Sequence, residues 1–294
     1  MARSKQWRPV MTAPSALEAP ADAPLLFRGP VDWIVNAAAD AGFDGVEIHF
    51  RAPEEIDWDL LRSSLRARAM KLTGIGTGRI FMTDGLSLSD ERQEVAAAAE
   101  ERLKGMMDRA GEHGASVILG VVRGRLSAQG EAKREEAYMR LVESYRRLSA
   151  YAAKSGCRIV VEGINSKDAD SLNSTDELLK LLEDVGDPNV LAHLDFCHMY
   201  IEGEDLAAAV KKAAGRIGYV HFADTERKAI GKGTIDYKAV LTALKDVGYE
   251  GAIGLEYVPA EEGWYNAVQP SRKQQMEYAK TGLVHVKALL DGIS

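Results

Sequence analysis

Short apolar runs alternate with longer amphipathic stretches along almost the whole of this chain of 294 residues. The runs have the length and composition of buried β-strands, and the stretches between them have helical periodicity. The expected strands lie near 45–50, 71–77, 115–122, 157–164, 190–198, 218–224 and 251–257. The expected helices lie near 31–41, 58–69, 89–112, 131–154, 174–185, 204–214, 236–247 and 271–291. Such an alternation indicates parallel strands joined by crossover helices.

A closed barrel is favoured over an open, doubly wound sheet. A dinucleotide-binding sheet carries a glycine-rich turn, and the motif GIGTG at 74–78 lacks the G-x-G-x-x-G spacing because position 79 is arginine. We interpret that motif as a flexible loop after a strand. A (β/α)8 barrel needs about 250 residues. We therefore predict an α/β fold that is a single (β/α)8 TIM barrel, with 1–294 as one domain.

Two apolar runs, at 7–12 and 25–28, could supply the first strand of the barrel. We expect the strand at 7–12, inside an extended N-terminal segment over 1–24. The following residues are rich in proline and alanine, so we expect 13–30 to form a long first loop.

Capping residues mark the ends of two later helices. Ser174 or Asp176 is expected to cap one helix N-terminus and Asp236 another, because their side chains can accept hydrogen bonds from free backbone N–H groups. Gly186 and Gly248 are expected at the matching C-terminal ends.

The composition excludes several classes of protein. The formal net charge of −7 argues against a nucleic-acid partner, which usually needs a basic face. No apolar run reaches the roughly 18 residues of a membrane span, and the first residues lack a secretory signal, so a cytoplasmic protein is expected. Cys157 and Cys197 fall in expected strands and are predicted to be buried thiols. Trp264 and Tyr265, after the last expected strand, would cover the barrel mouth or an interface.

Four polar residues each stand at or near the end of a late apolar run, about one strand and helix apart. They are Glu162 in CRIVVEGIN, Asp195 in VLAHLDFCH, His221 in GYVHFAD and Glu256 in GAIGLEY, hereafter the quartet. Successive parallel strands present their ends at one face of a barrel, where active sites lie. Three carboxylates and one imidazole suit a single Mn²⁺ or Mg²⁺ ion.

Four segments of the C-terminal half resemble a known family. They are VEGINSKDADSLNST, VLAHLDFCHMYIEGEDL, HFADTERKAIGKGTIDY and GYEGAIGLEY. They resemble the xylose-isomerase-like TIM barrels, and within them the ketose 3-epimerases of the tagatose and psicose (allulose) type. The earlier half agrees in its strand and helix rhythm alone.

The resemblance implies a role for each matching residue. The quartet aligns with the metal ligands of the family, and Glu162 and Glu256 also align with its two acid/base carboxylates. His198 and Arg227 align with residues that hold the oxygens of the sugar. Asp168 stands where the epimerases usually carry a glutamate that supports the first catalytic carboxylate. Related epimerases commonly form dimers or tetramers, so a homo-oligomer is expected.

Several further residues have two interpretations. Glu47, at the end of an early strand, is either a structural carboxylate in the barrel mouth or a substrate contact. Arg123 and Arg125 follow another strand and would hold a carboxylate or phosphate if they point inward, or lie solvated in a loop. His193 precedes Asp195 by two positions and so shares its barrel face. We expect His193 to be a satisfied core or supporting histidine and leave it out of the metal set.

The predicted function is that of a divalent-metal-dependent sugar isomerase or epimerase. It would act on a ketose or keto-sugar by removing and returning a proton through an enediolate, which a bound cation stabilises. A lyase on the same scaffold, either an inosose-type dehydratase or a 3-keto-glycoside eliminase, begins with the same proton abstraction and remains an alternative. A DNA-repair enzyme of the endonuclease IV type is less favoured, because its zinc site is rich in histidine and this acidic chain has six. A barrel that binds sugar without catalysis is disfavoured by the complete acid/base pair.

Overall fold

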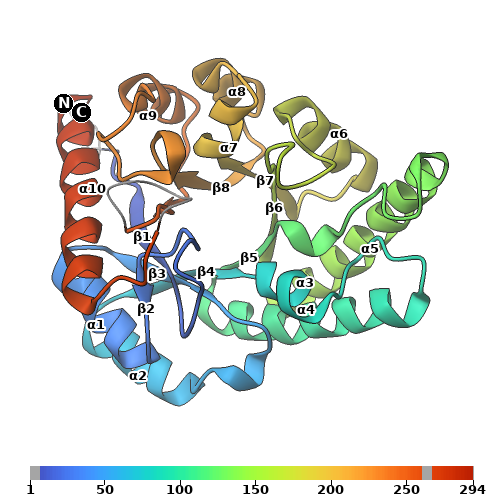
Figure 1. Ribbon diagram of the computed structural model, residues 1–294, viewed down its shortest axis with the longest axis horizontal. Helices are drawn as coiled ribbons and strands as arrows, with labels where there is room; N and C mark the ends of the chain where they lie inside the picture. Colours follow the sequence, from blue (N-terminus) through green and yellow to red (C-terminus); the bar gives the residue numbers. More distant parts are fainter. Residues whose placement is uncertain (1–6, 260–266, 294) are drawn as a thin grey trace, which may run out of the picture.

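Parallel strands close into a barrel that the helices surround (Figure 1). The computed structural model describes residues 7–259 and 267–293. Its strands are β1 (Val10–Ala16), β2 (Phe27–Arg28), β3 (Gly45–His49), β4 (Lys71–Gly76), β5 (Ser116–Leu119), β6 (Arg158–Glu162), β7 (Val190–Asp195), β8 (Ile217–Phe222) and β9 (Ala252–Leu255). From β1 and β3 to β9 the strands pair in sequence order, and the pairing of β1 with β9 closes the ring. The short β2 adds to β1, and the predicted (β/α)8 TIM barrel is confirmed.

The helices form the outer layer, where their apolar faces pack on the barrel (Figure 1). They are α1 (Val31–Ala41), α2 (Trp58–Ala67), α3 (Gly78–Asp84), α4 (Gln93–His113), α5 (Arg134–Ser155), α6 (Thr175–Val185), α7 (Phe196–Ile201), α8 (Leu206–Lys212), α9 (Tyr237–Asp246) and α10 (Arg272–Gly292). Short 3₁₀ turns are η1 (Pro53–Glu55), η2 (Val121–Arg123), η3 (Glu131–Lys133) and η4 (Thr225–Arg227). In the part of the chain that the structure describes, no helix could cross a membrane.

The predicted caps form. Ser174 accepts from the backbone N–H of Glu177 at the start of α6, and Asp236 accepts from Ala239 at the start of α9. Gly186 ends α6 in the left-handed conformation, and Gly248 adopts it just after α9. Both cysteines are buried and free, but neither lies in a strand, since Cys157 directly precedes β6 and Cys197 lies in α7.

The first strand lies later than the predicted 7–12: β1 begins at Val10 and continues to Ala16, so the first loop is correspondingly shorter. The alternative run near 25–28 also forms a strand, the two-residue β2. Pro14 is tolerated because β1 pairs with β9 only as far as Thr12 and with β2 only from Ser15. Its missing N–H therefore falls between two neighbours, and its carbonyl still accepts from Leu26. Residues 1–6, Trp264 and Tyr265 lie outside the described residues.

Two short helices replace predicted strand or loop. The loop expected at 74–78 instead completes β4, and α3 begins at Gly78. The strand expected over 190–198 ends at Asp195, whose carboxylate caps α7 by accepting from the N–H groups of Cys197 and His198. The barrel strand thus turns into a helix at a member of the quartet, and this turn fixes the carboxylate.

Inside the barrel, an apolar layer lies beneath a polar one. Ile118, Val160, Tyr219 and Ala252 form the apolar cluster. Glu162 and His221 follow Val160 and Tyr219 by two positions, so they face the same interior one layer nearer to the carboxyl ends of the strands. The polar layer is therefore closed off from below by packed side chains.

Candidate metal centre

The fold brings the quartet together at the carboxyl end of the barrel. Glu162 ends β6, Asp195 ends β7, His221 lies near the end of β8, and Glu256 follows β9. Strand register places Asp195 directly beside His221. One ligand atom from each of the four lies within 4.8 Å of all the others, and Asp195, His221 and Glu256 are buried. The predicted convergence is therefore observed.

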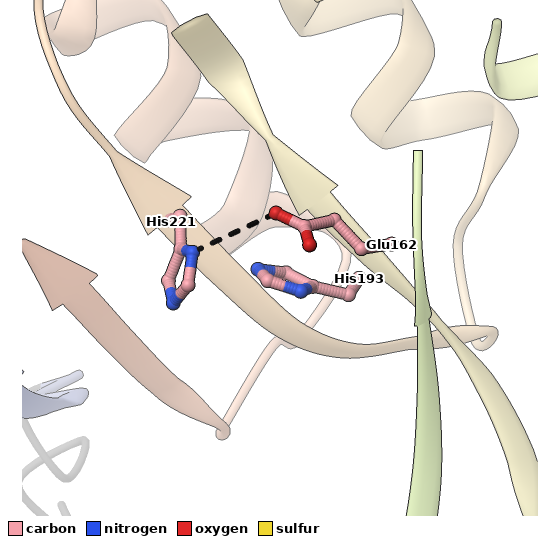
Figure 2. A group of neighbouring side chains, drawn as sticks. All are labelled: Glu162, His193 and His221. Carbon is pink, nitrogen blue, oxygen red and sulfur yellow. Dashed lines mark ion pairs between the residues drawn. The ribbon is translucent and has the colours of Figure 1, made fainter. Parts of the chain in front are cut away.

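His221 is the centre of this group. Its Nδ1 atom lies 3.4 Å from Glu256 Oε2, 3.9 Å from Asp195 Oδ2 and 4.0 Å from Glu162 Oε1. Figure 2 shows the approach of His221 to Glu162 across the barrel interior. Nδ1 has no hydrogen-bond partner among the described residues.

These residues fit a divalent cation. His221 Nε2 lies 2.9 Å from Glu47 Oε2, and this contact leaves Nδ1 facing the three carboxylates, where it would give its lone pair to a bound cation. Burial and the charge of Glu256 raise the pKa of Glu162 to about 8, since negative charges lie close together where little solvent reaches them. A cation among these oxygens would relieve that repulsion, as hard divalent ions prefer such ligands.

Glu47 is a buried carboxylate that joins two histidines. Its Oε2 lies 2.9 Å from His221 Nε2 and its Oε1 lies 2.6 Å from His49 Nε2. Burial alone would raise the pKa of Glu47, but His221 and His49 hold that pKa well below its usual range. Glu47 has no exposed surface. Its position matches the structural interpretation of the sequence more closely than a direct substrate contact.

Arg227 and His198 continue the polar network from the quartet to the surface. Arg227 Nη1 donates to Asp195 Oδ2 at 2.7 Å and lies 2.9 Å from Glu256 Oε2, while Nη2 donates to His198 Nε2 at 2.8 Å. Burial alone would raise the pKa of Asp195, but Arg227 holds it well below its usual range. His198 Nδ1 lies 2.6 Å from Asn165 Nδ2.

Asp168 forms the outer end of this network. Asn165 Nδ2 donates to Asp168 Oδ2 at 2.7 Å, and the Asp168 side chain is exposed. His198 and Arg227, which were expected to hold the sugar oxygens, are thus connected to Asp168 through Asn165.

The loop that carries Arg227 has a strained backbone, which one carboxylate holds in place. Glu226 and Arg227 have φ of 60° and 56°, a region that costs free energy for residues with a side chain. Asp224 accepts hydrogen bonds from the N–H groups of Thr225, Gly231 and Ile235. A Cβ atom on Gly233 would lie 2.3 Å from Asp224 Oδ1, so glycine is needed there. Gly231, with φ of 86°, and Gly233 therefore allow a tight turn after β8.

Arg123 lies away from the polar network, within the wall of the barrel. It is fully buried, and its guanidinium donates to the backbone carbonyls of Gly120, Glu162 and Ser171 at 2.9 to 3.0 Å. Those contacts tie the end of β6 to the loops on either side. Arg125 is exposed. Of the two interpretations, the solvated one fits Arg125, whereas Arg123 fits neither because it is buried against backbone carbonyls.

Two residues of the site had no assigned role in the sequence. His49 shares the inner face of β3 with Glu47, since it follows by two positions, and that period could have identified it. Its ring lies over Gly76, where an added Cβ would come within 2.4 Å. Asn165 follows Glu162 by three positions at a strand exit, but an asparagine in a loop is equally common as a turn residue.

Known proteins share the fold and part of the sequence of this chain. Residues 35–274 match the family model described as xylose isomerase-like TIM barrel. An L-ribulose 3-epimerase of Methylomonas sp. (strain DH-1) is 30% identical over 228 residues, covering 77% of this chain and 78% of that protein. An L-ribulose 3-epimerase of Mesorhizobium japonicum is 29% identical over 226 residues, covering 76% and 73%. A crystal structure of D-allulose 3-epimerase from Methylomonas sp. aligns with a TM-score of 0.77 at 25% identity, over 96% of this chain and 99% of that one. The chain therefore belongs to the xylose isomerase-like TIM barrel family.

Proposed function

We propose that this protein is a divalent-metal-dependent isomerase or epimerase that acts on a ketose or keto-sugar. The observation that carries the proposal is the convergence of Glu162 and Glu256 on one buried group with Asp195 and His221. A protein that only bound a metal would not need two carboxylates that can transfer a proton. A protein that only transferred a proton would not need those carboxylates to lie in one metal-binding group. Both features in one place suit proton transfer beside a carbonyl group.

The quartet would hold Mn²⁺ or Mg²⁺. A bound cation of this kind stabilises negative charge that develops on the sugar oxygens as the proton leaves. Glu47 orients His221 from behind through the contact of 2.9 Å, which fixes the ring nitrogen that faces the carboxylates. Arg123 braces the end of β6 through the carbonyl of Glu162 and is not proposed as a substrate contact.

Glu162 and Glu256 would move the proton. They come from β6 and from the end of β9, with β7 and β8 between them, so their carboxylates approach the barrel axis from different directions. Their side chains are 13% and 9% exposed, whereas Asp195 is fully buried, so they form the open edge of the quartet. One carboxylate takes the proton and the other returns it from the opposite side.

His198, Arg227 and Asp168 would hold the sugar oxygens through the network around Asn165. The names of the two L-ribulose 3-epimerases and of the aligned D-allulose 3-epimerase support a ketose as the substrate class. Asp168 is one carbon shorter than glutamate, so the sugar accepted here differs in its fit on that side.

The test is a reaction in heavy water with Mn²⁺ and a panel of ketoses, keto-inositols and 3-keto-glycosides, followed by mass spectrometry and NMR. Deuterium that enters at the carbon beside the carbonyl, together with the epimeric or isomeric sugar, is the expected result. Loss of water or of a glycosidic group instead would replace the proposal with the lyase.

Variants assign the two carboxylates. Glu162→Gln and Glu256→Gln should each lower turnover at least 1,000-fold, about the scale of a general acid or base. Glu100→Gln is the matched control, because Glu100 is also buried but pairs with Arg147 on the outer helices α4 and α5. Activity near that of the wild type in either active-site variant contradicts the assignment.

A further inference from the structure

His193 is a buried histidine that the catalytic proposal does not use. It lies on β7 two residues before Asp195 and has no exposed surface. Neither ring nitrogen has a hydrogen-bond partner within residues 7–259 and 267–293. An imidazole always offers a donor or an acceptor at each nitrogen, so this pair of unused atoms contradicts the satisfied histidine that the sequence suggested.

The ring faces two members of the quartet. Strand register places His193 beside Glu162 on one side and beside Tyr219 on the other. Its ring meets that of His221 edge to face, with centroids 4.2 Å apart and planes at 88°. Figure 2 shows the His193 ring reaching from its strand toward His221, next to the Glu162 side chain. Ligand atoms of Glu162, His193 and His221 lie within 4.8 Å of one another.

Packing alone gives no reason for an imidazole in this place. The neighbours below are Tyr219 and the apolar cluster, and an aromatic ring without nitrogen would make the same edge-to-face contact without two unpaired polar atoms. The unused nitrogens instead point to a ligand between the three side chains.

We propose that Glu162, His193 and His221 form a second cation-binding set, which overlaps the quartet and accepts ions that prefer nitrogen ligands. Two imidazoles and one carboxylate are a ligand set typical of Zn²⁺, whereas the oxygen-rich quartet suits Mn²⁺ and Mg²⁺. The sets share Glu162 and His221, so one cation occupies either the quartet or the second set. This inference rests on the metal site of the proposed function, but not on the reaction assigned to it.

The cation would therefore change position with its identity. Zn²⁺ is drawn toward His193, away from Asp195 and Glu256, and so loses one of the two acid/base carboxylates as a ligand. His193 would therefore give the site a position that is selective for Zn²⁺, which the quartet alone does not provide.

X-ray absorption of the wild-type protein loaded with one equivalent of Zn²⁺ or of Mn²⁺ tests this directly. Two imidazole ligands around zinc and one around manganese are expected. A single imidazole around zinc overturns the second set, and this measurement needs no variant to fold.

A substitution gives an independent test by calorimetric titration. His193→Leu should weaken Zn²⁺ binding at least tenfold, change Mn²⁺ binding less than twofold, and leave the metal-free protein as stable to heat as the wild type. A histidine needed only for packing would lower that stability and affect both metals alike. His113→Leu is the matched control, since His113 on α4 also has an unpaired buried nitrogen but lies outside the site, and it should change neither affinity.

The two proposals fail in different ways. If the wild type binds neither Mn²⁺ nor Mg²⁺, the proposed function is wrong. If Mn²⁺ binds and Zn²⁺ binding does not depend on His193, the second set alone is wrong.

Discussion

Glu47→Gln should weaken metal binding while the barrel stays folded. Glutamine has nearly the shape of glutamate, so the buried space remains filled, while the negative charge and one of the two acceptor oxygens are lost. Glu47 now makes two contacts to histidine, at 2.9 Å to His221 and 2.6 Å to His49. With its remaining oxygen on the His221 side, the variant replaces a charged acceptor behind a metal ligand with a neutral one.

The magnitude follows from the type of bond that changes. A hydrogen bond to a charged group is worth about 1.5 to 3 kcal/mol and a neutral one about 0.5 to 1.5 kcal/mol. A loss of about 1 to 1.5 kcal/mol at His221 corresponds to roughly tenfold weaker binding. Residues that support metal ligands commonly change affinity by about 10- to 100-fold, so tenfold is the lower end of the expected range.

Calorimetric titration of the metal-free protein with Mn²⁺ measures the change. Urea unfolding of the same samples shows whether stability falls as well, and Glu100→Gln provides a buried carboxylate that is lost far from the site. If Glu47→Gln binds Mn²⁺ as tightly as the wild type, the orienting role of Glu47 is refuted.

Three other predictions concern charge, the strained loop and close packing. The pKa of Glu162 is raised to about 8 in the metal-free fold, so between pH 4.5 and 8 the folded protein holds a proton that the unfolded chain has lost. The stability of the metal-free fold should therefore fall as pH rises from 4.5 to 8. Metal binding should then release protons at neutral pH and tighten toward pH 8. Calorimetric titrations in buffers of different ionisation enthalpy count the released protons, and a count of zero would contradict this prediction. Arg227→Lys keeps the charge, but a lysine cannot contact Asp195, Glu256 and His198 together, so kcat/KM should fall on the order of 100-fold. An unchanged kcat/KM would contradict the role of the Arg227 guanidinium. Gly76→Ala should lower the free energy of unfolding by about 1 to 3 kcal/mol because its Cβ would lie 2.4 Å from the His49 ring, whereas Gly78→Ala, whose Cβ meets only Val121 at 3.5 Å, should be nearly neutral in the same urea titration.

The fold was predictable because periodicity reports directly on burial. The strands from β3 to β9 and the long helices each have a continuous apolar face, and that pattern survives in the sequence. The end of β1 was predicted too early because a proline such as Pro14 usually ends a strand. The sequence does not reveal that Pro14 lies between the part of β1 that pairs with β9 and the part that pairs with β2, where no partner needs its N–H. The helix α7 was hidden because Asp195 serves as a strand end and a helix cap at once.

The site was predictable to the extent that its residues lie at strand ends. Glu162, Asp195, His221 and Glu256 follow from position alone, since parallel strands deliver their ends to one face. The direction of a loop side chain does not follow from position: Arg123 turns into the wall and Arg227 turns into the centre, although both follow a strand. The left-handed φ of Glu226 and Arg227 causes the second turn, and no residue preference predicts it for glutamate and arginine.

The closing pair of strands also sets when the metal centre can exist. β1 pairs with β9 through residues such as Val10 and Ala252, and the nearby contact of Trp7 with Tyr249 spans 242 positions of the chain. Contacts between such distant segments cost more loop-closure entropy than local ones, so we expect them to form late in folding. Glu256 stands one residue beyond β9, so it reaches the other three ligands only once the ring has closed. The rate of metal binding during refolding would therefore report on the closure of the barrel, because a cation supplied before closure would meet a site that lacks Glu256.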